Sequence, residues 1–211
     1  MDINEKKIEQ WSEYWRNYIG NYQLPSWDSI PDFGLYMDQV VTYVRNCLKY
    51  LENRSDSESV ITAPAINNYV RKKLMPQPLK KRYYRSHLAY LLILCALKPS
   101  LSITEIHELI PLDTGEDELR KFYEAFIEKH KRAADFFMDK VETLKKLVIK
   151  YAFLGNSFKD PAVEIVLDVA LISSFTKSLT DKLFLTDEAF NQTIGKDIST
   201  VSESPDDAKT P

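Results

Sequence analysis

The chain has 211 residues, of which 44% are hydrophobic and 28% charged, and its formal net charge is −3. These values are those of an ordinary soluble protein that buries a core without disulfide or metal support. The N-terminal residues contain no apolar signal segment, and no apolar run approaches the ~20 residues that a membrane span needs. We therefore expect a cytoplasmic protein with no membrane association.

Several classes of site are absent from the sequence. With only 5 glycines, the chain has no glycine-rich phosphate loop. No Ser/His/Asp set, Cys/His pair or HExxH motif is visible, so we expect neither an enzyme nor a cofactor or metal site. Cys47 and Cys95 lie in apolar helical patterns, and we expect buried thiols, with a disulfide as the lesser alternative.

Apolar periodicity predicts an all-α fold with seven helices. The stretch "LPSWDSIPDFG" interrupts the pattern near the N-terminus, and Trp27 is expected to pack that loop onto the core. The segment "LKKRYY" has the residue content of a small β-hairpin. We expect the helices at residues 4–19, 35–51, 63–73, 86–98, 102–110, 115–153 and 161–184.

Helix caps are predicted at four positions, because Ser and Thr hydroxyls accept hydrogen bonds from the first free backbone N–H groups of a helix. The sequence Ser102–Glu105 is a capping box. The other three caps are Thr62, Ser86 and Thr114, the last together with Asp117.

The positive charge of this acidic protein is concentrated in one segment. Residues 59–104 contain no Asp or Glu, yet they hold eight Lys and Arg residues. Subtracting these eight charges from −3 leaves −11 on the rest of the chain. Such a separation favours a single nucleic-acid-binding face, although a solvated surface without a partner is the simpler alternative. The eight residues are Arg71, Lys72, Lys73, Lys80, Lys81, Arg82, Arg85 and Lys98.

The same segment resembles the winged helix-turn-helix of MerR-type regulators. That family's Ile-x-Tyr-Tyr recognition helix corresponds to Ile66–Tyr69, and its Gly-Leu-x-Pro turn to Lys73–Pro76. Its wing pattern Arg-x-Tyr, followed after three residues by Asp-Leu, corresponds to Lys81–Tyr83 with His87 and Leu88. Its later Phe-Ser-Leu-x-Glu-Ile corresponds to Leu101–Ile106. The four motifs occur in the family's order within residues 62–110.

Two departures concern the recognition helix and the turn before it. Asn67 stands where the family usually has Arg, and Asn68 replaces a Tyr. The loop "ENRSDSESVI" is longer than the family's tight turn, which leaves the first helix of the motif open. More of the chain, about Leu24 to Ile110, resembles a small bacterial family of unknown function.

The residues and the resemblance together predict a DNA interface. Asn67 and Asn68 have the amide groups that pair bidentately with adenine, and the basic and tyrosine side chains suit phosphates. The alternative for both Asn residues is a surface position without a partner. The alternative for the Tyr69 ring is a place in the hydrophobic core. The predicted DNA-binding residues are Thr62, Ala63, Ala65, Asn67, Asn68, Tyr69, Arg71, Lys72, Lys73, Lys80, Lys81, Arg82, Tyr83 and Arg85.

The long helix predicted at residues 115–153 carries an apolar stripe with an eleven-residue repeat, which keeps the stripe on one face. We expect this stripe to form a homodimer seam, and a contribution from the 161–184 helix is left open. Packing within the monomer against that helix is the alternative. The seam residues are Phe122, Phe126, Phe137, Val141, Leu144 and Val148.

These expectations combine into one hypothesis. The protein is a homodimeric, sequence-specific double-stranded DNA-binding transcriptional regulator, with repression favoured over activation. The alternative is a protein–protein adaptor whose winged helix no longer binds DNA. An effector of the C-terminal helices is left open. The expected regions are an N-terminal helical region (1–58), a MerR-like winged helix with a small β wing (59–112), a helical dimerisation region (113–185) and a disordered acidic tail (186–211).

Overall fold

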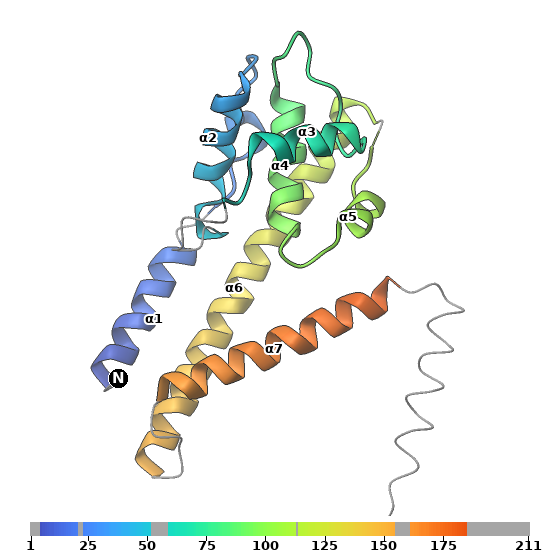
Figure 1. Cartoon of the computed structure of the whole chain (residues 1–211). Coiled ribbons are helices and arrows are strands. Elements are labelled where there is room, and N and C mark those ends of the chain that lie inside the picture. The colour runs from blue at the N-terminus through green and yellow to red at the C-terminus, as the bar shows by residue number, and fades with distance from the viewer. Residues whose placement is uncertain (1–4, 21–22, 52–58, 113, 155–160, 185–211) are drawn as a thin grey trace, which may run out of the picture. The chain divides into compact units, whose positions relative to one another are not determined.

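The computed structural model describes residues 5–20, 23–51, 59–112, 114–154 and 161–184. The chain divides into two compact units, Met1–Ile165 and Val166–Pro211, and each is considered by itself. The described residues contain no β-strand, only two isolated β-bridges, so the fold is all-α as predicted. Figure 1 labels the helices as α1 (Glu5–Gly20), α2 (Met37–Cys47), α3 (Ala63–Arg71), α4 (Arg85–Leu97), α5 (Ile103–Leu109), α6 (Glu116–Leu154) and α7 (Pro161–Leu183). Two 3₁₀ helices, η1 (Trp27–Ser29) and η2 (Lys49–Leu51), lie on either side of α2 in the sequence.

Helix α4 is the centre of the first unit. Its nine consecutive residues from His87 to Cys95 are all buried, on every side of the helix. No charged residue lies between Arg85 and Lys98, so α4 has no face that prefers water. Helices α2 and α6 both pack against it (Figure 1). Burial raises the pKa of the Cys95 thiol in this helix to about 12, so the thiol stays protonated and unreactive.

The loop before α2 closes one side of this core. Leu24, Trp27 and Ile30 are buried. The indole of Trp27 meets the Tyr123 ring edge-on, with centroids 5.9 Å apart. The Tyr123 hydroxyl donates to the carbonyl of Pro25 at 2.9 Å. The prediction that Trp27 packs the loop onto the core is therefore confirmed.

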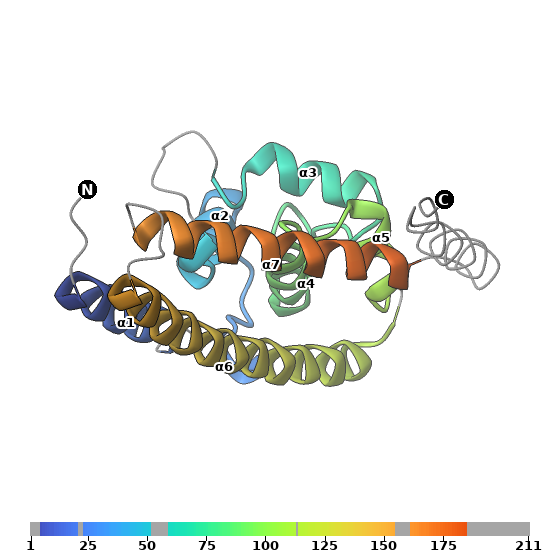
Figure 2. The same ribbon diagram turned by 90° about the horizontal axis from the view of Figure 1, so that it is seen from below.

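Helix α1 lies alongside the C-terminal half of α6 in both views (Figures 1 and 2). Ser12 Oγ of α1 donates to Glu142 Oε1 at 2.6 Å, and Arg16 forms an ion pair with the same carboxylate. The hydrogen bond from Ser12 is the main cause that lowers the pKa of Glu142. Part of the long helix is thus packed within the chain, with α1 as its partner.

A second contact to α6 comes from η2. Tyr50 Oη and His130 Nε2 lie 2.7 Å apart, and the two rings meet edge-on. The Tyr18 hydroxyl of α1 donates to the carbonyl of Lys49 in the same 3₁₀ turn, at 3.0 Å. This turn occupies the end of the helix predicted at residues 35–51. The prediction of one continuous helix was wrong at this end, because α2 ends at Cys47 and the backbone at Leu48 leaves helical geometry.

The helix caps were predicted with mixed success. Thr62 accepts from the Ala65 N–H, and Ser102 and Glu105 form the reciprocal capping box. The cap at Ser86 was wrong, because α4 begins at Arg85 and the acceptor for its N-cap N–H is the His87 ring. The Thr114 hydroxyl donates to Pro111 O instead of capping α6, which begins at Glu116.

Partial burial lowers the pKa of His130 below its ordinary value of 6.5. The unfolded chain therefore binds this proton more readily than the folded chain does. We expect this residue's contribution to the free energy of unfolding to be complete above pH 6.5 and to be lost as the pH falls through the folded pKa. Urea unfolding from about pH 8 to about pH 5 measures the slope.

In His130→Gln the slope should become shallower than in the wild type. His107→Gln, which makes the same replacement at an exposed histidine on α5, is measured beside it as the matched control. An unchanged slope in His130→Gln would contradict the assignment.

Candidate nucleic-acid interface

The acid-free segment forms α3, the turn after it, a tight hairpin and α4. Helix α3 begins at the Thr62 cap, with a proline in its first turn, where no N–H is needed. Its apolar residues fall on one face, so Ile66, Tyr69 and Val70 are buried while Asn67 is exposed. The sequence of α3 thus determines which face meets the core and which meets water.

The end of α3 is a Schellman motif with a lysine in the left-handed position. The Leu74 N–H donates to Tyr69 O at 3.0 Å, and the Lys73 N–H donates to Val70 O at 3.0 Å. Lys73 has φ 58°, a conformation that glycine adopts at much lower cost. The exposed side chains of Lys72 and Lys73 project from this turn.

The hairpin that follows has a two-residue loop made entirely of lysine. Leu79 and Arg82 exchange both backbone hydrogen bonds, at 3.0 and 2.9 Å. Between them Lys80 and Lys81 have φ values of 49° and 63°, which is the type I′ geometry that favours Asn-Gly. Both lysines are exposed at the tip. The segment "LKKRYY" therefore does form a hairpin, but through isolated bridges and without the β-strands of the predicted wing.

The hairpin is attached to the segment before α2. Leu35 and Tyr83 exchange backbone hydrogen bonds of 2.8 and 2.9 Å, and both side chains are buried. Arg82 lies over the ring of Tyr36, 4.6 Å from its centroid, and donates to the Tyr36 hydroxyl at 2.8 Å. It also donates to Gly34 O at 3.3 Å. Arg82 thus holds the hairpin to residues 34–36.

A buried histidine fixes the base of the hairpin. His87 is 4% exposed, and its Nδ1 accepts from the Tyr84 N–H at 3.0 Å. Its Nε2 lies 3.1 Å from the carbonyl of Gln77. Because Nδ1 accepts, Nε2 carries the proton and donates to Gln77, which is the neutral tautomer. The ring therefore connects both ends of the hairpin segment to the first turn of α4.

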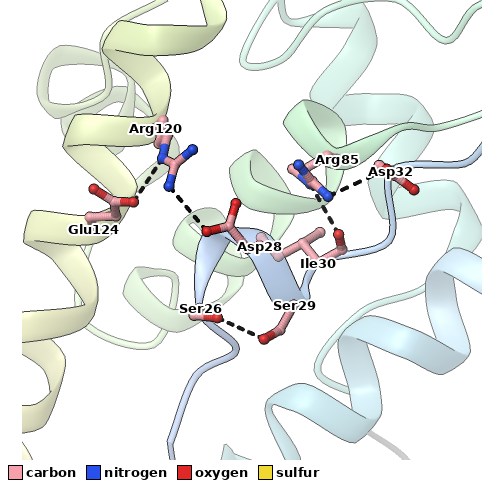
Figure 3. A network of polar contacts seen from close by, with 8 residues as sticks. All are labelled: Ser26, Asp28, Ser29, Ile30, Asp32, Arg85, Arg120 and Glu124. Atoms are coloured by element: carbon pink, nitrogen blue, oxygen red, sulfur yellow. Dashed lines mark hydrogen bonds and ion pairs between the residues drawn. The ribbon is translucent and has the colours of Figure 1, made fainter.

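Two further arginines fasten the loop before α2 (Figure 3). Arg85 Nε donates to Ile30 O at 3.0 Å, and its guanidinium lies 3.7 Å from Asp32. Arg120 Nη2 donates to Asp28 at 3.1 Å. Figure 3 shows that these arginines reach the loop from α4 and α6 respectively. The Arg85 guanidinium is therefore already engaged by groups of the protein itself, Ile30 O and Asp32.

The structure divides the predicted DNA-binding residues into three groups. Tyr69 and Tyr83 are buried, and burial raises the pKa of Tyr69 to about 12. Their rings are core, so the prediction that their hydroxyls meet phosphates is not supported by this geometry. Arg82 and Arg85 make internal contacts. The remaining residues are exposed or half-buried on α3, next to its two ends, or at the hairpin tip: Thr62, Ala63, Ala65, Asn67, Asn68, Arg71, Lys72, Lys73, Lys80 and Lys81.

The two asparagines differ in their surroundings. Asn68 is half-buried, and its Oδ1 accepts from Arg71 Nη2 at 2.9 Å. Asn67 is exposed. The sequence treats the pair alike, and only the register of α3 separates them.

The predicted seam of α6 is partly covered by its own chain. Leu119 and Tyr123 beside the stripe are fully buried. Phe122, Phe126 and Val141 are half-buried, whereas Phe137 is 39% exposed. The side chains of Leu144 and Val148 lie outside the described residues.

Sequence reasoning missed Gly34, Tyr36 and the role of His87. In the sequence, Gly34 indicated only an interruption between helices, and no pattern predicted a functional role for Tyr36. Their role arises from the pairing of Leu35 with Tyr83, 48 residues away, which no local pattern reveals. His87 followed the wing motif, but its two hydrogen bonds required the folded hairpin.

Within the described ranges, no helix is long and apolar enough to cross a membrane, and no cluster of three potential metal-binding side chains occurs.

Comparison with known proteins identifies one domain. Residues 25–126 match the family model described as "Domain of unknown function (DUF1836)", so a DUF1836 domain extends from the loop before η1 into the first third of α6. This range contains the whole hairpin and its attachments. No curated protein and no solved structure matches the chain.

The close approach of the hairpin to Gly34 gives a test of this architecture. A Cβ at Gly34 would lie 2.8 Å from Arg82 Cδ and 2.9 Å from its Cβ. Gly34→Ala should therefore displace Arg82 from Tyr36 and lower the free energy of unfolding by about 1–3 kcal/mol. Urea unfolding measures the change.

Gly115→Ala is the matched control, because nothing lies within 4 Å of a Cβ there. That variant should be neutral or slightly more stable. Equal stability of both variants would mean that the hairpin is not held as described.

Proposed function

We propose that this protein is a homodimeric DNA-binding transcriptional regulator with a winged helix-turn-helix, in which α3 enters the major groove and the Lys80–Lys81 hairpin serves as the wing. Repression is favoured over activation.

One observation carries the proposal. Three of the residues between α3 and α4 adopt left-handed backbone geometry, and all three are exposed lysines: Lys73, Lys80 and Lys81. An L-residue in this geometry costs roughly 1–2 kcal/mol relative to glycine. Glycine or asparagine would satisfy the turns better, so backbone conformation gives no reason for lysine. The positive charges themselves are a reason, since duplex DNA presents one negative charge per ~1.7 Å.

The arrangement of the elements supports a winged helix. Helix α2 packs against α3 and is the first helix of the proposed helix-turn-helix. The bridge Leu35–Tyr83 ties the hairpin to the segment that precedes α2, and the bridge Leu79–Arg82 closes the hairpin itself. In the MerR-type pattern a glycine stands at the position of Lys73, and Lys73 has the positive φ that a glycine there would provide.

The side chains divide into base and phosphate contacts. Asn67 is the exposed amide on α3 and is the residue proposed to pair with a base edge. Asn68 accepts a hydrogen bond from Arg71 and is proposed to position its guanidinium for a phosphate of the DNA backbone. The four lysines at residues 72, 73, 80 and 81 are proposed to meet phosphates, which fix the register of a protein on DNA.

A protein–protein adaptor is the second candidate, and a particular observation favours it. Phe33 and Leu79 are each 63% exposed, and Tyr36 is 53% exposed. These side chains lie on the hairpin and on the segment attached to it. An exposed apolar group of this kind suits a protein partner as well as a nucleic acid.

The double substitution Lys80→Asn, Lys81→Gly separates the two roles of the hairpin. It replaces strained lysines by the preferred type I′ pair, so the free energy of unfolding should rise by about 1–2 kcal/mol. DNA binding should weaken at the same time. For a wild-type dimer that neutralises about eight phosphates, log K falls with log salt at a slope of about −7, and losing four contacts reduces that slope by about 3.6.

Lys98→Gln is the matched control. Lys98 is exposed at the far end of α4, ~20 Å from its N-terminus at 1.5 Å per residue, and it belongs to the same acid-free segment. The control should change neither stability nor the salt slope. A stabilised double variant that binds DNA unchanged would refute the DNA interface, and a wild type that binds no genomic DNA at low salt would favour the adaptor.

Asn67 and Asn68 should behave differently. Asn67→Ala should weaken binding to the specific site by about 1–3 kcal/mol and leave random DNA almost unaffected, because a bidentate base contact is lost. Asn68→Ala should weaken both DNAs to a similar extent, because it releases Arg71. Fluorescence anisotropy on a selected site and on a scrambled duplex measures both; identical profiles would show that Asn67 reads no base.

A further inference from the structure

Helix α7 exposes an unusual amount of apolar surface for its length. Nine of its large apolar side chains are exposed. It is too polar to be a membrane span. The exposed residues are Val163, Val166, Leu167, Val169, Leu171, Ile172, Phe175, Leu179 and Leu183.

Four of these residues, Val169, Ile172, Leu179 and Leu183, follow together with Thr176 the spacing of a coiled coil. Residues 169, 172, 176, 179 and 183 are separated by steps of three, four, three and four, and Ile165 continues the spacing one step earlier in the sequence. The opposite face is apolar only as far as Leu171. The stripe is therefore the long apolar face of α7, and it reaches the end of the helix.

The polar residues of α7 are compatible with such a seam. Thr176 is the one polar residue of the stripe, and its hydroxyl donates to Ile172 O at 2.8 Å. It therefore enters an apolar seam without an unsatisfied donor. Lys177 and Asp181 form an ion pair on the side of the helix away from the stripe. Asp168 and Lys182 flank the stripe near its two ends.

We propose that the homodimer is formed by two α7 helices packed antiparallel along the stripe. In this arrangement Val169 faces Leu179 of the second copy, and Ile172 faces its Thr176. The same register places Asp168 beside Lys182 of the second copy at both ends, and brings the two Phe175 rings together at the two-fold axis. A parallel pair offers no such match, because Asp168 then lies beside Ser173.

This inference assigns the seam of the dimer assumed in the proposed function to α7 instead of α6. Helix α6 already uses part of its apolar surface against α1 and η2. All measurements below are made without DNA, so a failure of the seam and a failure of DNA binding are distinguishable.

The first test compares two adjacent residues of the full-length protein. Sedimentation should give the wild type twice the 24.5 kDa chain mass. Ile172→Asp places unpaired charges in the seam and should raise the dimer dissociation constant at least about a hundredfold. Leu171→Asp is the matched control, because Leu171 is similarly exposed but lies off the stripe, and it should remain dimeric.

The second test determines the direction of the helices. Asp168→Lys or Lys182→Asp alone should weaken the dimer on the order of tenfold, through two repulsive contacts. The double variant should recover wild-type affinity, since each new lysine then meets a new aspartate. The control exchanges Lys177 and Asp181, which keeps their pair within one helix and should leave the dimer unchanged.

Several outcomes would overturn the inference. A monomeric wild type, a dimer insensitive to Ile172→Asp, or a dimer split by Leu171→Asp would each show that the stripe is not the seam; the last would point to the opposite face of α7. Loss of helical circular dichroism in Ile172→Asp would mean that α7 packs within its own chain. A double charge exchange without recovery would exclude the antiparallel register.

Discussion

The burial of α4 on all sides is the constraint on which the first unit depends. Nine consecutive buried residues without an intervening charge require a cover on every face, because each exposed apolar side chain would forgo about 1.5–3 kcal/mol of burial. Helices α2 and α6 supply part of this cover. The loop containing Trp27 packs against α6 through Tyr123. The position of α4 also fixes the hairpin, since the chain enters the helix directly from Tyr84.

The hairpin illustrates how a few polar contacts stand in for a β-sheet. Only two isolated bridges are present in the described residues, too few for an independently stable sheet. His87 compensates by tying the segment to α4, and Arg82 by tying it to the chain before α2. Arg85 joins α4 to the same stretch of chain before α2. Arginine and lysine are therefore not equivalent here. The planar guanidinium groups make several internal contacts, whereas the lysines remain at the surface.

The apolar surface beyond the core is divided between two long helices. Along α6 it is partly used within the chain, against α1 and η2, and Leu119 and Tyr123 belong to the core. Along α7 a heptad stripe is exposed instead. The eleven-residue repeat of α6 shows that one face of that helix is apolar, and a regular stripe does not report what covers the face.

The sequence by itself determined the helices, most of their ends and the location of the positive charge. These follow from apolar period, proline positions and side-chain caps such as Thr62 and Ser102, all of which act within a few residues. Only the tertiary structure decided which charged and aromatic groups are exposed and available to a binding partner. Tyr69 and Tyr83 turned inward, Arg82 and Arg85 were engaged by Tyr36, Ile30 and Asp32, and a lysine pair closed a turn that normally favours Asn-Gly. Most of these outcomes depend on contacts between segments far apart in the chain, such as Leu35 with Tyr83, and such contacts leave no periodic trace in the sequence.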